Sequence, residues 1–332
     1  MSIAEVTKPQ ETSGAGGGNL LLKWLPPIVL ILAIIGIVLV VPMTAGDSDA
    51  RTWYRDTVGG SELYRLNVIF GRLVPLLAGA FIAIALMQRQ HLKAREVHSA
   101  ESLQRHGWTE VLTHWLNAAG IVICIVTAAM LLGWFGDLSL NTLLMLHFIG
   151  AGFVVAAVAH HVTYQLVDGG RGLLRWGKRE PMNALAEAVS YAGVYRGVPG
   201  AFGVQLPQNA RRRVQPLLRR FNIVPDYAGK YLATEKVISY TGWAVLVGVV
   251  VVTGLIKSLH YVYGMPGWLR QWSSFLHDGA VYFFIAMLIV HVAALTLVPR
   301  NWRLLLSMFT TRVPRKYAEE HLPLWAEEAK PE

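Results

Sequence analysis

Residues 276–298 read LHDGAVYFFIAMLIVHVAALTLV, and this stretch decides the fold. A helix needs about 20 residues to cross the roughly 30 Å hydrocarbon core of a bilayer. Here a single charged residue, Asp278, stands near one end of an apolar run of that length, so the stretch predicts a transmembrane helix. It also holds His277 and His291, two polar side chains at a depth where such groups are costly and commonly functional.

Five more segments are long and apolar enough to span a membrane: about 25–41, 66–87, 111–134, 141–166 and 237–257. The chain of 332 residues is 54% hydrophobic and only 15% charged, whereas a soluble domain is about a quarter charged. This composition argues against a soluble enzyme, a disordered chain and a fibrous protein. We predict an all-α polytopic membrane helical bundle of six spans. The first span follows Lys23 like the core of a signal peptide, and we treat it as retained.

The basic residues indicate how the spans are oriented. Of the 30 lysines and arginines, 24 lie in four segments outside the spans: 1–23, 88–110, 167–236 and 299–332. Basic residues accumulate on the cytoplasmic side, so the sequence predicts a multi-pass protein with both termini in the cytoplasm. The same rule accounts for the net charge of +9 without a nucleic-acid partner. The single cysteine, Cys124, leaves this chain no disulfide and no cysteine-held iron–sulfur cluster of its own.

The histidines are the most informative residues. Six of the eleven lie within or at the ends of the spans: His114, His147, His160, His161, His277 and His291. His277 and His291 are 14 residues apart, which is about 40° short of four helical turns and a rise of about 21 Å. Both imidazoles therefore share one face of a helix, one near each side of the bilayer.

This arrangement is typical of a helix that binds two stacked haems, since neutral imidazole is a common axial ligand of haem iron. His147 begins the fourth span on the outer side, level with His277. His114 begins the third span on the inner side, level with His291. His161 lies 14 residues after His147 and competes for the inner position, and the geometry leaves the two alternatives open. In a competing interpretation, the histidines bond backbone carbonyls or line a proton path.

Residues outside the spans are expected to form polar surface. His106 lies in an inner loop and is expected to be solvated. Residues 314–332 predict a short surface helix, and Trp302 and Trp325 are expected to anchor the C-terminal segment at the membrane interface.

From about residue 106 onward, several motifs occur together along the chain. They are His114-Trp115, Leu146-His147, Gly229-Lys230-Tyr231 with Lys236, Thr253-Gly254, the pair His277 and His291, and a tail with Met308, Val313, Tyr317-Ala318, His321 and Pro323-Leu324-Trp325. With these motifs the chain resembles the gamma subunit of respiratory formate dehydrogenase, a four-helix dihaem cytochrome b. The membrane cytochromes b of nickel–iron hydrogenases are similar in their histidine layout.

The resemblance implies two haem b groups, with His114 rather than His161 as the inner ligand. It implies an electron-transfer subunit of an oxidoreductase complex in the bacterial inner membrane. An iron–sulfur subunit and a catalytic dehydrogenase subunit with molybdenum or tungsten would supply electrons to the outer haem. The electrons would cross the bilayer and reduce a membrane quinone near the inner haem. The quinone pocket would include Lys230, Tyr231 and Thr234.

Two features depart from that family. Leu232-Ala233-Thr234-Glu235 stand where the family usually offers an asparagine and a glycine to the quinone, and leucine cannot donate a side-chain hydrogen bond. Two additional N-terminal spans precede the family's four-helix core. The predicted organisation is a flexible tail (1–23), two additional helices (24–105), a dihaem core with an inner loop (106–298, loop 167–236) and a cytoplasmic C-terminal tail (299–332).

Two alternative functions remain open. A cytochrome b subunit of a nickel–iron hydrogenase or another oxidoreductase would share the haems but serve a different electron donor. A proton-coupled transporter or a membrane anchor would carry no haem. A transporter is expected to hold carboxylates inside its spans, and Asp278, at one end, is essentially the only one in the third to sixth spans. The sequence therefore favours the cytochrome.

Overall fold

The computed structural model describes residues 20–46, 63–91, 99–167, 177–195, 200–223, 229–260 and 263–329. Within these ranges six helical segments are long and apolar enough to cross a membrane. They are α1 (Leu20–Gly46), α3 (Leu63–His91), α4 (Trp108–Leu131), α5 (Leu140–Val167), α8 (Thr241–Leu259, preceded by the π-helical turn η1, Glu235–Tyr240) and α9 (Gly267–Thr296). The prediction of an all-α bundle with six spans is confirmed.

Shorter elements lie between and after the spans. They are β1 (Ser102–Gln104), α6 (Glu180–Ser190), α7 (Gln208–Arg220), the 3-10 turn η2 (Pro299–Asn301), α10 (Trp302–Thr310), β2 (Arg312–Pro314), α11 (Arg315–His321) and α12 (Pro323–Glu328). The flexible tail predicted for residues 1–23 falls outside the described residues, except for 20–23, which form the first turn of α1.

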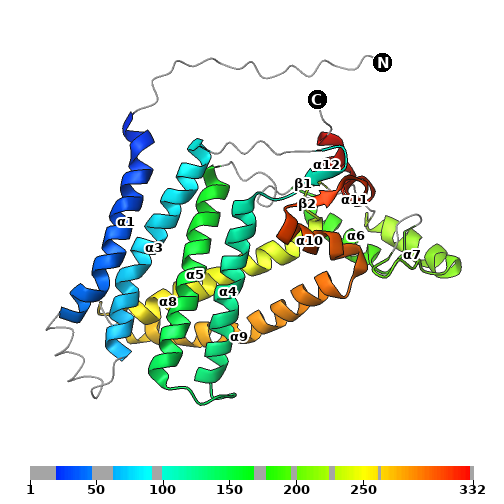
Figure 1. Cartoon of the computed structure of the whole chain (residues 1–332). Coiled ribbons are helices and arrows are strands. Elements are labelled where there is room, and N and C mark those ends of the chain that lie inside the picture. Colours follow the sequence, from blue (N-terminus) through cyan, green and yellow to red (C-terminus); the bar gives the residue numbers. More distant parts are fainter. Residues whose placement is uncertain are drawn as a thin grey trace.

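The six long helices form two groups. Figure 1 shows α1, α3, α5 and α4 side by side in this order, and each neighbouring pair is in contact. The second group is the pair α8 and α9, drawn in yellow and orange, which crosses this row at a steep angle. In this crossing α9 contacts α4, and α8 contacts both α3 and α5. Every histidine-bearing helix of the predicted core therefore contacts another such helix.

The sixth span begins nine residues before the start predicted from hydropathy, at Gly267 rather than Leu276. Pro266 stands at its N-terminal cap, a place where proline does not interrupt the helical hydrogen bonds. The first turns carry the exposed rings of Trp268 and Trp272. Tryptophan favours the membrane–water interface, so the helix extends beyond the apolar run on which the prediction rested.

A polar contact joins the added helices α1 and α3 to each other, and an aromatic contact joins α3 to the core. Arg72 of α3 donates to the hydroxyl of Thr44 on α1 at 2.9 Å, and Thr44 in turn donates to the carbonyl of Val40. This hydrogen bond gives a charged side chain in the span a partner, as its depth requires. On the other side of α3, Phe70 stacks on Phe148 of α5 with ring centroids 4.6 Å apart.

The C-terminal segment does not lie free on the surface. It folds over the end of the bundle that is predicted to be cytoplasmic, here called the inner end. β2 pairs antiparallel with β1, which places Val313 opposite Leu103. Around this pair lies a buried apolar cluster, here called the inner cap: Leu103, Leu232, Leu304, Val313, Tyr317, Ala318, Leu322, Trp325, Ala326 and Ala329. The expectation that Trp325 anchors the chain at the membrane interface is wrong, because its side chain is buried in this cluster. Trp302 is exposed, as expected.

Helices α4 and α5 approach each other closely at two glycines. A Cβ atom on Gly120 would lie 2.6 Å from the carbonyl oxygen of Gly150. A Cβ atom on Gly150 would lie 2.9 Å from the carbonyl oxygen of Gly120 and equally close to the sulfur of Cys124. At both positions one of these neighbours is a backbone carbonyl oxygen, which cannot yield without moving a helix.

We therefore expect Gly120→Ala to push α4 away from α5 and to cost about 1–3 kcal/mol, as overpacking does in other cores. The unfolding temperature of the purified protein in detergent measures the effect. Gly79→Ala in α3 is the matched control, because a Cβ atom there meets nothing within 4 Å and alanine favours a helix. Equal unfolding temperatures for the two variants would contradict the close crossing.

Candidate haem sites

The first pair of facing histidines joins α5 to α9 on the side predicted to be outside. The rings of His147 and His277 have centroids 6.1 Å apart and are inclined by 70°. Gly254 of α8 makes room beside them, since a Cβ atom there would lie 2.9 Å from Cε1 of His277. The two histidines predicted to form the outer pair therefore face each other, one from α5 and one from α9.

The second pair joins α4 to α9 on the predicted inner side. The ring centroids of His114 and His291 are 6.4 Å apart, with 44° between the ring planes. Two tryptophan rings lie beside this pair at nearly right angles to the imidazoles, Trp115 with its centroid 5.5 Å from that of His114 and Trp243 6.1 Å from that of His291. One helix, α9, thus supplies one histidine to each pair, as its 14-residue spacing predicts.

The spacing of both pairs fits an iron held between two imidazoles. A histidine nitrogen binds a transition metal at about 2 Å and lies about 1 Å from its ring centre, so two rings on opposite sides of one metal have centres about 6 Å apart. Among the described residues no group of three or more His, Cys, Asp or Glu side chains is placed to hold a metal ion. Two ligands suffice for haem iron, because the macrocycle provides the rest.

A threonine hydroxyl contacts each histidine of the outer pair. Oγ1 of Thr127 lies 2.9 Å from Nδ1 of His147, and Oγ1 of Thr253 lies 3.1 Å from Nδ1 of His277. Each Nδ1 is thereby occupied by the protein, and Nε2 is the nitrogen left for a metal. Such contacts orient histidine ligands in many metal sites.

An apolar layer lies between the two pairs along the helices. Its buried members are Ile121, Val154, Val247, Ala280 and Phe284, and Ile125, Val158, Trp243, Leu246, Val250 and Val251 pack against them. These residues come from α4, α5, α8 and α9, between the positions of the outer and the inner histidines. The layer gives the region between the two pairs a low dielectric.

The other two histidines of α5 are placed differently. Nε2 of His161 lies 3.0 Å from the hydroxyl of Tyr240, so the structure pairs His161 with a tyrosine and not with His291. His160 is buried between α4 and α3, with Nδ1 against Thr113 at 3.2 Å and Nε2 against Gln88 at 2.8 Å. Both rings have protein partners that explain their place.

The segment predicted to contact quinone is fixed at the inner end of the bundle. The backbone carbonyl of Lys230 accepts a hydrogen bond from Arg105. The ring of Tyr231 is buried, with the Lys230 ammonium 5.8 Å from its centroid. Thr234 donates both its amide and its hydroxyl to Glu187 of α6, at 3.0 and 2.8 Å. Its hydroxyl proton is therefore already used within the chain.

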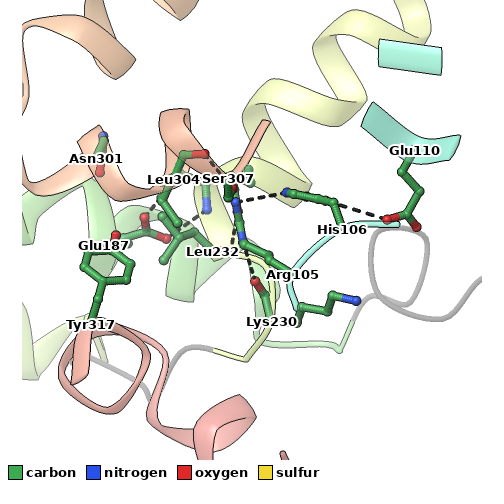
Figure 2. A network of polar contacts seen from close by, with 12 residues as sticks. Arg105, His106, Glu110, Glu187, Lys230, Leu232, Asn301, Leu304, Ser307 and Tyr317 are labelled. Atoms are coloured by element: carbon green, nitrogen blue, oxygen red, sulfur yellow. Dashed lines mark hydrogen bonds and ion pairs between the residues drawn. The ribbon is translucent and has the colours of Figure 1, made fainter. Parts of the chain in front are cut away.

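Arg105 is the centre of a buried polar network beside this segment. Figure 2 shows its guanidinium between the ring of His106 and the carbonyl of Lys230. It also donates to Glu235 at 2.6 Å, and Glu235 accepts the amide of Leu232 at 2.9 Å. Burial opposes the charge of Arg105, but Glu235 outweighs this effect and raises the pKa of the guanidinium above its ordinary value. The Arg105 guanidinium and the Glu235 carboxylate therefore form an ion pair.

His106 connects this network to the start of α4. Burial lowers the pKa of His106 below its ordinary value, although the Glu110 carboxylate, 3.7 Å from Nδ1, opposes this. Glu110 also accepts the amide of Gly107 at 3.0 Å, which satisfies one of the free amides at the helix N-terminus. The expectation that His106 is solvated is wrong, because its side chain is buried between Arg105 and Glu110.

Sequence reasoning missed these polar partners and the role of Thr127. Glu110 stands three residues after Gly107 and just before an apolar run, which is a recognisable capping position. Thr127 is an isolated hydroxyl in the apolar stretch that follows Asn117. The contact between Arg105 and Glu235 joins residues 130 positions apart, and nothing local in the sequence indicates it.

A membrane bundle whose helices face each other through histidine pairs is the architecture of a membrane cytochrome. A family model described as prokaryotic cytochrome b561 matches residues 105–311, well over half of the chain, and the chain belongs to this family. It is a multi-pass membrane b-type cytochrome of electron transfer that binds haem b. No curated protein and no solved structure matches the chain significantly. Helices α1 and α3 lie outside the matched residues.

We expect Glu235→Gln to destabilise the protein, because it leaves the Arg105 charge buried without its counter-charge. The Arg105 side chain is 2% exposed and that of Glu235 30%, so the cost is expected near the lower end of the about 3–5 kcal/mol found for broken buried pairs. Lys257→Gln is the control. It breaks a pair with Asp278 whose side chains are 35% and 49% exposed, and is expected to cost under about 1 kcal/mol. Unfolding temperatures in detergent compare the two, and similar shifts would contradict the assigned role.

Proposed function

We propose that this cytochrome holds two haem b groups, one near each side of the membrane, and carries electrons between a peripheral dehydrogenase and membrane quinone. The outer iron would be ligated by His147 and His277. The inner iron would be ligated by His114 and His291. The observation that supports this proposal is the spacing of both ring pairs, 6.1 and 6.4 Å, on a single shared helix.

The position of His161 supports the choice of the inner ligand. His161 is held by the hydroxyl of Tyr240, whereas His114 faces His291 directly. The resemblance to the gamma subunit of formate dehydrogenase favours the same ligand, because its inner haem is held from the first helix of the four-helix core. We therefore retain His114 and leave His161 as a packing residue.

When bound, haem supplies the one-electron chemistry that no side chain here provides. The chain's own residues hold the iron ligands in place, keep Nδ1 of the outer histidines occupied, and exclude water from the layer between the pairs. With both termini on the inner side, as the basic residues predict, electrons would move inward from the outer to the inner site. Moving one electron across the bilayer would change its electrostatic energy by about 2.3 kcal/mol per 100 mV of membrane potential.

We place the quinone at the inner end, beside His291 and the segment with Lys230, Tyr231 and Thr234. Arg105 and Glu187 hold the backbone of this segment through the Lys230 carbonyl and the Thr234 amide. Lys230 and Tyr231 are then the side chains best placed to contact the quinone. Thr234 would act mainly by fixing the segment, since its hydroxyl is donated to Glu187.

The electron donor is proposed from the resemblance alone. An iron–sulfur subunit bound on the outer face would deliver electrons from a formate dehydrogenase-like catalytic subunit, in the bacterial inner membrane. A nickel–iron hydrogenase is the second candidate donor, since its cytochrome b has a similar histidine layout. Membership of the cytochrome b561 family argues against a transporter without haem.

The inner site is tested by two alanine variants in proteoliposomes. We expect His291→Ala to reduce the haem content from two per polypeptide to one and to abolish electron transfer between the remaining haem and a water-soluble quinone analogue. His161→Ala is the matched control on the same side and is expected to keep both haems and the transfer. Loss of a haem in His161→Ala, with both retained in His291→Ala, would contradict the assignment.

A further inference from the structure

The two histidine pairs differ in the partners of their Nδ1 atoms. Both outer histidines have a threonine hydroxyl at Nδ1, at 2.9 and 3.1 Å. For His114 and His291, no hydrogen bond to the ring is found in the part of the chain that the structure describes, and the rings of Trp115 and Trp243 lie beside them. The outer site is therefore polar at its ligands and the inner site is aromatic.

The direction of the outer hydrogen bonds follows from where the hydroxyl protons go. Thr127 donates its proton to the carbonyl of Ile123, four residues earlier, at 2.7 Å. Thr253 donates in the same way to the carbonyl of Val249 at 2.6 Å. Each hydroxyl oxygen therefore accepts a hydrogen bond from the imidazole. Nδ1 is the donor of this bond and must carry the proton. The unprotonated nitrogen is then Nε2.

We infer that Thr127 and Thr253 act as positioning residues that fix this tautomer and lower the reduction potential of the outer haem relative to the inner one. The inference rests on the proposed ligation of two haems. An imidazole whose Nδ1–H group donates a hydrogen bond is a more basic ligand at Nε2. A more basic ligand stabilises ferric over ferrous iron, so the reduction potential of the haem falls. The outer site carries two such bonds.

Charges beside the outer site do not supply this difference. Lys257 lies near His277, but its ammonium is paired with Asp278 at 2.7 Å, so the two charges largely cancel there. The backbone carbonyl acceptors of both threonine hydroxyls belong to the same helices as the threonines, α4 and α8. The geometry of each hydroxyl is thus set by its helix and does not depend on a neighbouring loop.

A lower reduction potential at the outer haem makes inward electron flow, from the outer to the inner haem, energetically downhill.

The test is a spectroelectrochemical titration of the purified full-length protein, with haem content measured in parallel. Thr127→Val and Thr253→Val keep the side-chain shape and remove the acceptor. Each is expected to raise the lower-potential component by about 59 mV, which corresponds to a roughly tenfold loss of preference for the ferric state in a one-electron couple. The higher-potential component is expected to stay in place, and two haems are expected to remain bound.

Two further variants serve as controls. Thr127→Ser keeps the hydroxyl and is expected to titrate like the unmodified protein. Thr296→Val removes a hydroxyl of α9 that donates to the carbonyl of Val292 at 2.7 Å and touches no histidine among the contacts of the described residues. It is expected to leave both potentials unchanged. Should Thr127→Val lose the outer haem while Thr127→Ser keeps it, the hydroxyl is again shown to position the ligand.

The inference is overturned if the valine variants keep two haems and the lower potential does not move, or if the higher-potential component moves instead. It is also overturned if Thr127→Ser changes the titration as much as Thr127→Val, because then the packing of the side chain is responsible and not the hydroxyl. A failure of the proposed two-haem function is distinguishable, since it would leave the unmodified protein with fewer than two haems.

Discussion

The structure depends on holding four imidazoles in two facing pairs within an apolar bundle. A polar ring at this depth needs a partner, and no aqueous solvent supplies one. Helix α9 meets this constraint for both sites, because its two histidines share a face and each meets a histidine of another helix at about 6 Å. The tight crossing at Gly120 and Gly150 packs α4, which carries His114, against α5, which carries His147.

The histidines at the two ends of the bundle are held in place by different contacts. At the outer end, hydroxyls bonded to their own helices hold the rings. At the inner end, the ring of His114 lies near a folded cap in which Arg105 ties the start of α4 to the segment before α8. The C-terminal residues close over this network through the inner cap. Buried contacts thus lie beside the segment where a quinone is proposed to bind.

Much of this arrangement could be predicted from the sequence because it depends on local periodicity. Span lengths follow from bilayer thickness, and the 14-residue spacing of His277 and His291 places both rings on one face. Depth then suggests their partners. The choice between His114 and His161 could not be derived in this way, because both are predicted at the inner level. The packing distinguishes them, since His114 faces His291 and His161 contacts the hydroxyl of Tyr240. The burial of His106 and Trp325 also depends on contacts between residues far apart in sequence, so local polarity predicted it wrongly.

The measurement that tests the central claim most directly is the haem content of the purified, unmodified chain. Pyridine haemochrome quantification against the polypeptide concentration, with a reduced-minus-oxidised spectrum, gives both the number and the type of haem. Two b-type haems per polypeptide are expected, one for each facing pair. A single haem would contradict the assignment of one of the pairs, and a folded preparation with no haem would contradict both.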